Sequence, residues 1–208
     1  MKGLIVKDLI NLKKYSRTVL LIIAFYILFS FMVDSMEFLS GMIVLMCAVS
    51  TITSFAYDSQ SGWDMYALTL PLPKKNIVLA KYVLALLLTL IGTLLAILAG
   101  WLIGLIKQQS NFVETLIVSY SLFAVAVLFL SVLLPLVYRF GVERSRVLII
   151  AVFTIPTAAV IALAQTGAFT MPDETLINQL LVLSPPVLVA CASGSVAISC
   201  RIFQRKRA

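Results

Sequence analysis

Long apolar runs alternate with short polar connections along this chain. We expect helices that cross a membrane over residues 19–33, 39–56, 79–106, 115–138, 147–165 and 177–200. These runs are close to the ~20 residues that a helix needs to cross roughly 30 Å of hydrocarbon. Residues 57–78 form the largest polar segment between them. The pattern therefore predicts an all-α membrane protein with six transmembrane helices in one domain, residues 1–208.

The residues before the first apolar run are too polar to span a membrane. On a helical wheel they divide into an apolar face with Ile5, Leu9 and Leu12 and an opposite face with Lys7, Asn11 and Lys14. This division is typical of an amphipathic helix that lies in the membrane interface. A cleaved signal peptide is the alternative, but the apolar stretch after Arg17 is long and no small-residue cleavage site closes it. We expect an interfacial helix over residues 1–17.

Fifteen of the sixteen Lys and Arg residues lie at every second junction between apolar runs, and Lys107 is the exception. They form four groups: Lys2, Lys7, Lys13, Lys14 and Arg17; Lys74, Lys75 and Lys81; Arg139, Arg144 and Arg146; and Arg201, Arg205, Lys206 and Arg207. Short loops rich in Lys and Arg stay on the cytosolic side, because moving them across the bilayer is unfavourable. We therefore expect both termini and residues 57–78 to be cytosolic.

The composition excludes an ordinary soluble fold. Apolar residues make up 62% of the chain and charged residues 12%, with a mean hydropathy of +1.08. A soluble protein of this composition would expose a large apolar surface to water. The net charge of +7 is typical of nucleic-acid-binding proteins, but here the cations form juxtamembrane groups. Such groups face an anionic cytosolic leaflet, so we expect contact with membrane lipid and none with nucleic acid.

The chain carries no recognisable catalytic or metal-binding motif. It has no histidine and no Gly-rich phosphate loop, and its three cysteines all lie inside apolar runs. A buried carboxylate pair or a membrane-embedded Lys, which an ion-coupled carrier would need, is also not expected. We predict no catalytic residue, no metal and no cofactor in this chain. If the protein moves a substrate uphill, another polypeptide must supply the energy.

Span three carries small residues at a strict spacing of four: Gly92, Ala96, Gly100 and Gly104. Small residues on one helix face allow another helix to approach closely in lipid. We expect this stripe to pack within one protomer, and a dimer seam is the alternative.

Prolines interrupt spans four, five and six at Pro135, Pro156, Pro185 and Pro186. Each proline frees a backbone carbonyl one turn earlier, such as that of Ser131 or Val152, and tends to kink the helix. The prolines indicate tolerated bends, with hinges as the second interpretation.

The cytosolic segment 57–78 carries the most specific features. Ser59 can cap a short helix that Pro71 and Pro73 would end. Its candidate contact residues are Asp58, Trp63, Asp64, Tyr66 and Leu68. Either this helix rests on the membrane or it docks on a cytosolic protein. We favour docking, because carboxylates beside a Trp/Tyr anchor suit a protein groove better than an anionic lipid surface.

Asp58, Trp63 and the stretch LTLPLPKKNIVLAKY, Leu68 to Tyr82, resemble the segment after the second helix in small ABC-2 type permeases. These permeases are the membrane halves of ATP-binding-cassette exporters, and in that family a similar stretch contains the coupling helix that docks into the nucleotide-binding subunit. The connection FGVERSR, residues 140–146, is similar to the family's second cytosolic loop. The resemblance implies coupling roles for Glu143 and Arg144, and an elbow role for the N-terminal interfacial helix.

The resemblance covers nearly the whole chain and implies a homodimeric permease that pairs with a separate ATPase subunit, which would bind ATP and Mg²⁺. Relatives in the small bacterial branch export amphipathic peptides, such as phenol-soluble modulins and lantibiotics, or confer immunity to them. Larger members have a sizeable outer region between spans five and six, whereas only residues 166–176 are available here. The outer gate is therefore abbreviated or built from the ends of the spans.

We expect a permease that exports an amphipathic peptide or lipid-like substrate across the bacterial cell membrane between two protomers. The expected lining residues are Ser30, Thr51, Thr53, Ser54 and Thr154. One alternative is an immunity or sensor protein that binds a peptide without transporting it. Another is an intramembrane enzyme, but the spans offer no polar catalytic group at depth.

Overall fold

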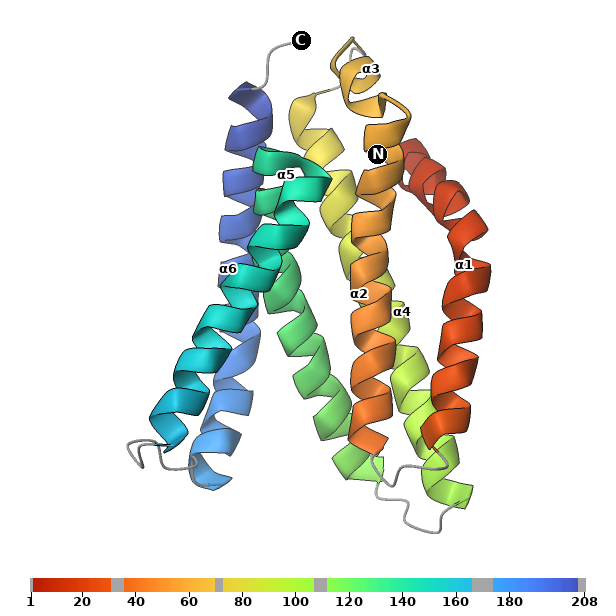
Figure 1. Ribbon diagram of the computed structural model, residues 1–208, viewed down its shortest axis with the longest axis vertical. Coiled ribbons are helices and arrows are strands. Elements are labelled where there is room, and N and C mark those ends of the chain that lie inside the picture. Colours follow the sequence, from red (N-terminus) through yellow and green to blue (C-terminus); the bar gives the residue numbers. More distant parts are fainter. Residues whose placement is uncertain (1, 31–35, 70–72, 107–111, 166–173, 206–208) are drawn as a thin grey trace.

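The computed structural model describes residues 2–30, 36–69, 73–106, 112–165 and 174–205. These residues form six helices and no strand: α1 (Lys2–Ser30), α2 (Met36–Gln60), α3 (Trp63–Thr69), α4 (Lys74–Ile106), α5 (Phe112–Gln165) and α6 (Glu174–Arg205). The long helices run side by side along the length of the molecule (Figure 1). The short helix α3 lies at the same end as the start of α1 and the end of α6.

Four of the described helical segments are long and apolar enough to cross a membrane. They are Phe38–Gln60, Lys74–Ile106, Phe112–Ser145 and Leu183–Arg205. A shorter apolar helix covers Tyr15–Phe29. The chain is thus a multi-pass, all-helical membrane protein, and the predicted total of six spans stays a prediction.

Helix α1 runs without a break from Lys2 to Ser30, so the structure does not divide it at residue 17. The predicted interfacial helix forms its first part and the first predicted span its second part. A separate interfacial helix stays a prediction.

Helix α5 contains a sharp reversal at Gly141, where φ is 79° and ψ is 174°. A residue with a side chain rarely adopts this backbone conformation, whereas glycine adopts it readily. The two parts of α5 on either side of Gly141 form a helical hairpin (Figure 1). The reversal lies inside the predicted connection 140–146, between the segments expected as spans four and five.

Helix α2 is the most deeply buried of the four membrane-spanning candidates. Its apolar stretch is 61% buried, whereas the other three membrane-spanning candidates are 33% buried or less. The glycine stripe of α4 packs against it: a Cβ added at Gly92 would lie 2.6 Å from the Cβ of Cys47. Ala96, Gly100 and Gly104 on the same stripe are also buried. The stripe therefore allows close packing inside one protomer.

A chain of hydroxyl groups joins α4, α5 and α6. The Ser195 hydroxyl donates to the Ser131 carbonyl at 2.6 Å, the carbonyl that Pro135 leaves without its helical partner. The Tyr82 hydroxyl lies 2.6 Å from Ser195 Oγ and 2.8 Å from Ser199 Oγ. Since Ser195 already donates to the carbonyl, Tyr82 donates to Ser195. The carbonyl freed by Pro135 is thus bound by a side chain from α6, which in turn contacts a side chain from α4.

Candidate functional site

The short helix α3 begins at Trp63, after a turn at Gly62. Gly62 has a φ of 65°, and its carbonyl accepts hydrogen bonds from the backbone N–H groups of Met65 and Tyr66. Glycine in this left-handed conformation commonly ends the preceding helix. The expected cap at Ser59 is therefore wrong, because Ser59 belongs to the last turn of α2, four residues before α3 begins.

The outer face of α3 carries two large side chains. Met65 is 70% exposed and Tyr66 is 57% exposed, whereas Ala67 is buried. Trp63 is half-buried and packs against the hydrophobic core. The Trp63 and Tyr66 rings contact each other with their centroids 5.4 Å apart. Of the other predicted contact residues, the side chains of Asp64 and Leu68 lie outside the described set.

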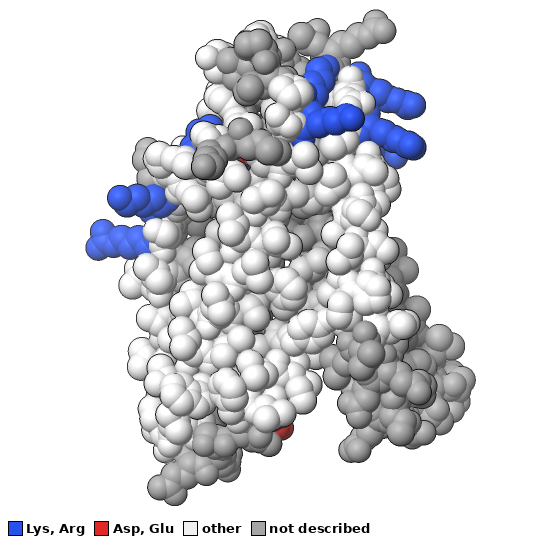
Figure 2. Space-filling model, turned by 180° about the vertical axis from the view of Figure 1, so that it is seen from behind, with Lys and Arg blue, Asp and Glu red and all other residues white. Residues whose placement is uncertain are grey.

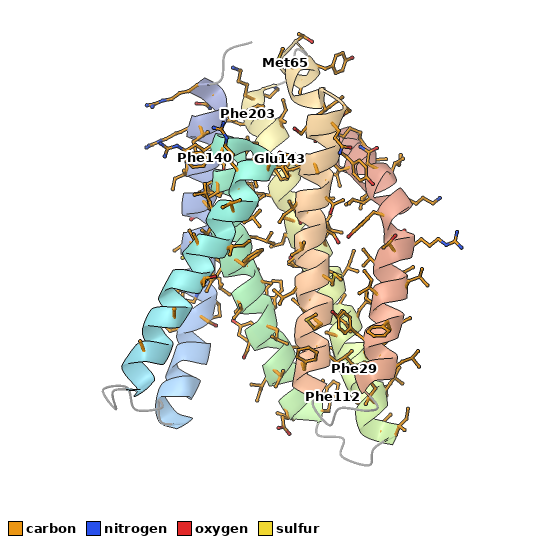
Figure 3. All side chains as sticks on the ribbon, in the orientation of Figure 1. Phe29, Met65, Phe112, Phe140, Glu143 and Phe203 are labelled. Atoms are coloured by element: carbon orange, nitrogen blue, oxygen red, sulfur yellow. The ribbon has the colours of Figure 1, made fainter. Side chains whose placement is uncertain are left out.

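The Gly141 reversal lies at the same end of the bundle as α3. Figure 3 shows Phe140 and Glu143 at this end together with Met65, and Phe29 and Phe112 at the opposite end. Glu143 and Arg144 are both exposed, whereas Val142 beside them is buried. The structure thus brings two of the predicted coupling segments to one end of the molecule.

Four charged side chains lie next to α3, on the side that faces the bundle. We call them the charge cluster: Lys7 and Asp8 from α1, Asp58 from α2 and Lys81 from α4. Asp8 and Asp58 are each 2% exposed and Lys81 is 5% exposed. Two cations and two carboxylates leave no net charge. Pairing of this kind is required, because an unpaired ion in a protein interior is strongly unfavourable.

Lys81 joins three helices through its ammonium group. Its Nζ lies 2.6 Å from Asp58 Oδ2 and 3.0 Å from Asp8 Oδ2. It also donates a hydrogen bond of 2.7 Å to Ser54 Oγ. A lysine ammonium has three donors, and here each of them has an acceptor.

Lys7 connects the charge cluster to α3. Its Nζ lies 2.7 Å from Asp58 Oδ1 and 4.0 Å from the centre of the Trp63 ring. This is the geometry of a cation–π contact. The Nζ is also 3.1 Å from Asp8 Oδ1, but Asp8 Oδ1 accepts no hydrogen bond from the described residues. We take that contact as an ion pair without the alignment of a hydrogen bond.

The charge cluster corrects the prediction that no carboxylate pair is buried, and it places Asp58 inside the bundle. The sequence predicted no buried carboxylate pair, whereas Asp8 and Asp58 are both buried beside Lys81. The expectation of no membrane-embedded Lys stays a prediction. Asp58 was expected at a partner's surface, and its carboxylate instead binds Lys7 and Lys81. One feature of the sequence could have indicated the cluster: Lys81 lies two turns inside the helix that begins at Lys74, where a lysine needs a partner of opposite charge.

The residues predicted to line a pathway between two protomers stay a prediction, and within one protomer they differ in exposure. Thr51 and Ser54 are buried within the protomer, Thr53 is half-buried and Thr154 is exposed. The side chain of Ser30 lies outside the described set. An open cavity of about 210 Å³ lies elsewhere, between α1, α2 and α4; it is lined by Leu12, Tyr15, Ser16, Val19, Leu20, Ile23, Cys47, Ser50, Leu88, Ile91 and Leu95.

Within the described residues no group of three or more His, Cys, Asp or Glu side chains is arranged to hold a metal ion. The charge cluster contains two carboxylates, and both are bound to lysines. The charge cluster is a set of ion-pair contacts between α1, α2 and α4.

Comparison with known proteins identifies the family. No curated protein and no solved structure matches the chain. A family model described as "ABC-2 family transporter protein" matches residues 3–204, which include all six helices except the first residue of α1 and the last residue of α6. Membership agrees with the bundle of apolar helices. The chain belongs to the ABC-2 transporter family and is a membrane permease component, which is not itself an ATPase, of an ATP-binding-cassette transporter.

Proposed function

We propose that this protein is the permease subunit of an exporter that moves an amphipathic peptide or a lipid-like substrate out of the cell. ATP and Mg²⁺ would bind to a separate ATPase subunit, and two copies of the permease would enclose the route. The observation that carries the proposal is the exposed face of α3. In an ABC-2 permease, which associates with an ATPase subunit, this face is the best candidate for the docking surface.

The docking surface is assigned to Met65 and Tyr66, with Glu143 and Arg144 as a second contact. Exposed Met and aromatic side chains are favoured at protein interfaces because they adapt to a groove and bury a large area. Trp63 is half-buried and packs against the core, so we assign it the role of holding α3 in place. Asp64 and Leu68 are retained as proposed contacts on the same short helix.

The distribution of charge supports a cytosolic position for this end of the bundle. Figure 2 shows the described Lys and Arg side chains gathered towards the α3 end, with none at the opposite end of the face in view. Clusters of Lys and Arg next to membrane helices favour the cytosolic side. An ATPase in the cytosol would then meet α3 directly.

The cavity between α1, α2 and α4 supports an amphipathic or lipid-like substrate. The hydroxyls of its two serines already donate hydrogen bonds to backbone carbonyls of their own helices: Ser16 to the Lys13 carbonyl and Ser50 to the Met46 carbonyl. The walls therefore offer mainly hydrocarbon contact, and such cavities favour apolar ligands over water. A sugar or an ion would lose hydrogen bonds there without replacement.

The test is capture of the ATPase subunit by the tagged permease, combined with export from cells. Met65→Asp together with Tyr66→Asp places two charges on the docking surface. Loss of hot-spot contacts worth about 2 kcal/mol weakens binding roughly thirtyfold, so recovery of the ATPase and export both fall. Phe112→Asp is the matched control, because Phe112 is 50% exposed at the opposite end of the bundle (Figure 3).

Normal ATPase recovery and export by the Met65/Tyr66 variant would contradict the docking assignment. The alternative function, a sensor or immunity protein that binds a peptide, makes a different prediction. It requires peptide binding by the permease alone and protection of cells that lack the ATPase.

A further inference from the structure

We infer that the charge cluster is the joint through which movement of α3 is passed to the membrane helices, and this inference rests on the proposed function. Lys7, Asp8, Asp58 and Lys81 are then positioning residues for transport. They would act without touching the substrate or the nucleotide.

A continuous series of contacts leads from the exposed face of α3 to the charge cluster. The Tyr66 ring, at the surface, contacts the Trp63 ring. The Lys7 ammonium lies 4.0 Å from the centre of the Trp63 ring and 2.7 Å from Asp58 Oδ1. Because cation–π attraction requires the cation to stay over the ring face, a displacement of Trp63 changes the force on Lys7.

Inside the charge cluster each carboxylate contacts both cations. Asp58 uses Oδ1 for Lys7 and Oδ2 for Lys81, and Asp8 uses the corresponding oxygens for the same two lysines. Charges at these distances interact strongly when they are shielded from water. No member can move without changing its distance to an oppositely charged partner, so α1, α2 and α4 respond together.

An aromatic column continues the connection towards α5 and α6. Lys81 Nζ lies 4.9 Å from the centre of the Phe55 ring on α2. The Phe55 ring contacts the Tyr138 ring at 5.3 Å, and Tyr138 contacts Phe203 at 5.7 Å between centroids. The contacts therefore extend from α3 to every long helix of the bundle.

Stability alone does not explain a buried charge cluster. Replacing buried ion pairs by uncharged side chains of similar volume is often neutral or stabilising, and the best-attested use of such pairs is in setting register or in switching. Asp8 Oδ1 also lacks a hydrogen bond from the described residues.

The experiment combines a distance measurement on the permease with export. The test variant carries Lys7→Met, Asp8→Asn, Asp58→Asn and Lys81→Met, which removes two charges of each sign and leaves the net charge unchanged. Spin labels on Met65→Cys in α3 and Leu90→Cys in α4, in a background without native cysteines, report how firmly α3 is held. We expect a narrow distance distribution in the intact cluster and a broad one in the variant.

In cells, the test variant should still recover the ATPase subunit, while export falls by about tenfold, within the usual range of coupling between sites. Tyr82→Phe is the matched control, because it removes contacts between α4 and α6 one residue from the cluster. If the test variant does not accumulate in cells, Trp63→Leu replaces it. Trp63→Leu removes the contact between the Lys7 ammonium and the Trp63 ring and leaves all four charges of the cluster in place.

The two proposals fail in different ways. If the tagged wild-type permease captures no ATPase subunit and exports nothing, the proposed function fails. The distance measurement on the permease still tests whether the charge cluster holds α3. An unchanged distance distribution, or full export by the test variant or by Trp63→Leu, overturns the joint and leaves the docking assignment intact.

Discussion

At the scale of single residues, Lys81 is the position where the structure departs most from expectation. Lys81 belongs to one of the basic groups at every second junction between apolar runs, and we expected those groups at the membrane surface. Its ammonium is instead buried between three helices. Lysine carries its charge on a long apolar stem, and that stem allows the Lys81 ammonium to reach the charge cluster at the α3 end of the bundle. Its partners are distant in sequence.

Removing Lys81 alone should destabilise the permease strongly. Lys81→Met leaves two buried carboxylates with one cation, and breaking a buried ion pair on one side costs about 3–5 kcal/mol. The measurement is the thermal unfolding midpoint of the detergent-solubilised protein, which should fall clearly.

The paired variant Asp58→Asn with Lys81→Met is the control for that prediction. It removes one charge of each sign, so most of the lost stability should return. If Lys81→Met unfolds at the wild-type temperature, the lysine is not paired as described.

The residues of the charge cluster were visible in the sequence, but their pairing was not. Asp8 and Asp58 each occur singly at a polar segment, where an exposed carboxylate is the ordinary expectation. Lys7 and Asp58 are separated by 51 positions. Only the packing of α1 against α2 brings them together, and no periodicity within one helix records that packing.

At the scale of helices, local sequence was more informative. The apolar runs predicted the long helices, and the prolines after Leu70 predicted the end of α3. Pro135 identified Ser131 as a carbonyl without a helical partner, but the hydroxyl that binds it comes from Ser195, 64 positions away. The spacing of glycines in α4 predicted a close contact, and the structure gives its partner as α2.

The contact between α4 and α2 makes Gly92 sensitive to substitution. In Gly92→Ala the new Cβ would lie 2.6 Å from Cys47 Cβ and 3.4 Å from Val44 Cα. Overpacking of this kind costs typically about 1–3 kcal/mol, and the unfolding midpoint should fall accordingly.

Gly194→Ala is the matched control, because nothing lies within 4 Å of its added Cβ and alanine favours a helix by up to about 1 kcal/mol. Cys47→Gly should partly rescue Gly92→Ala by removing the clashing Cβ. Equal unfolding midpoints for Gly92→Ala and Gly194→Ala would show that α2 and α4 do not pack at this distance.

At the scale of the whole molecule, the start of α1, the helix α3 and the end of α6 lie at one end (Figure 1). We expect this end to face the cytosol, because the basic residues gather there. Ser61 is exposed beside α3, so Ser61→Cys in a background without Cys47, Cys191 and Cys200 reports its side of the membrane.

An impermeant thiol reagent should label Ser61→Cys in inverted vesicles and not in intact cells. The reason is the unfavourable transfer of short Lys- and Arg-rich segments across the bilayer. A cysteine in place of Glu114, exposed at the opposite end of the bundle, is the control and should label in intact cells. Labelling of Ser61→Cys from outside would reverse the topology and remove α3 from the reach of a cytosolic ATPase.

The electrical neutrality of the charge cluster has a consequence for the energy source of transport. A single elementary charge that crosses a membrane potential of 100 mV gains or loses about 2.3 kcal/mol. Two lysines and two aspartates that shift together carry no net charge through that field. The membrane voltage therefore does no net work when all four side chains move together as one unit.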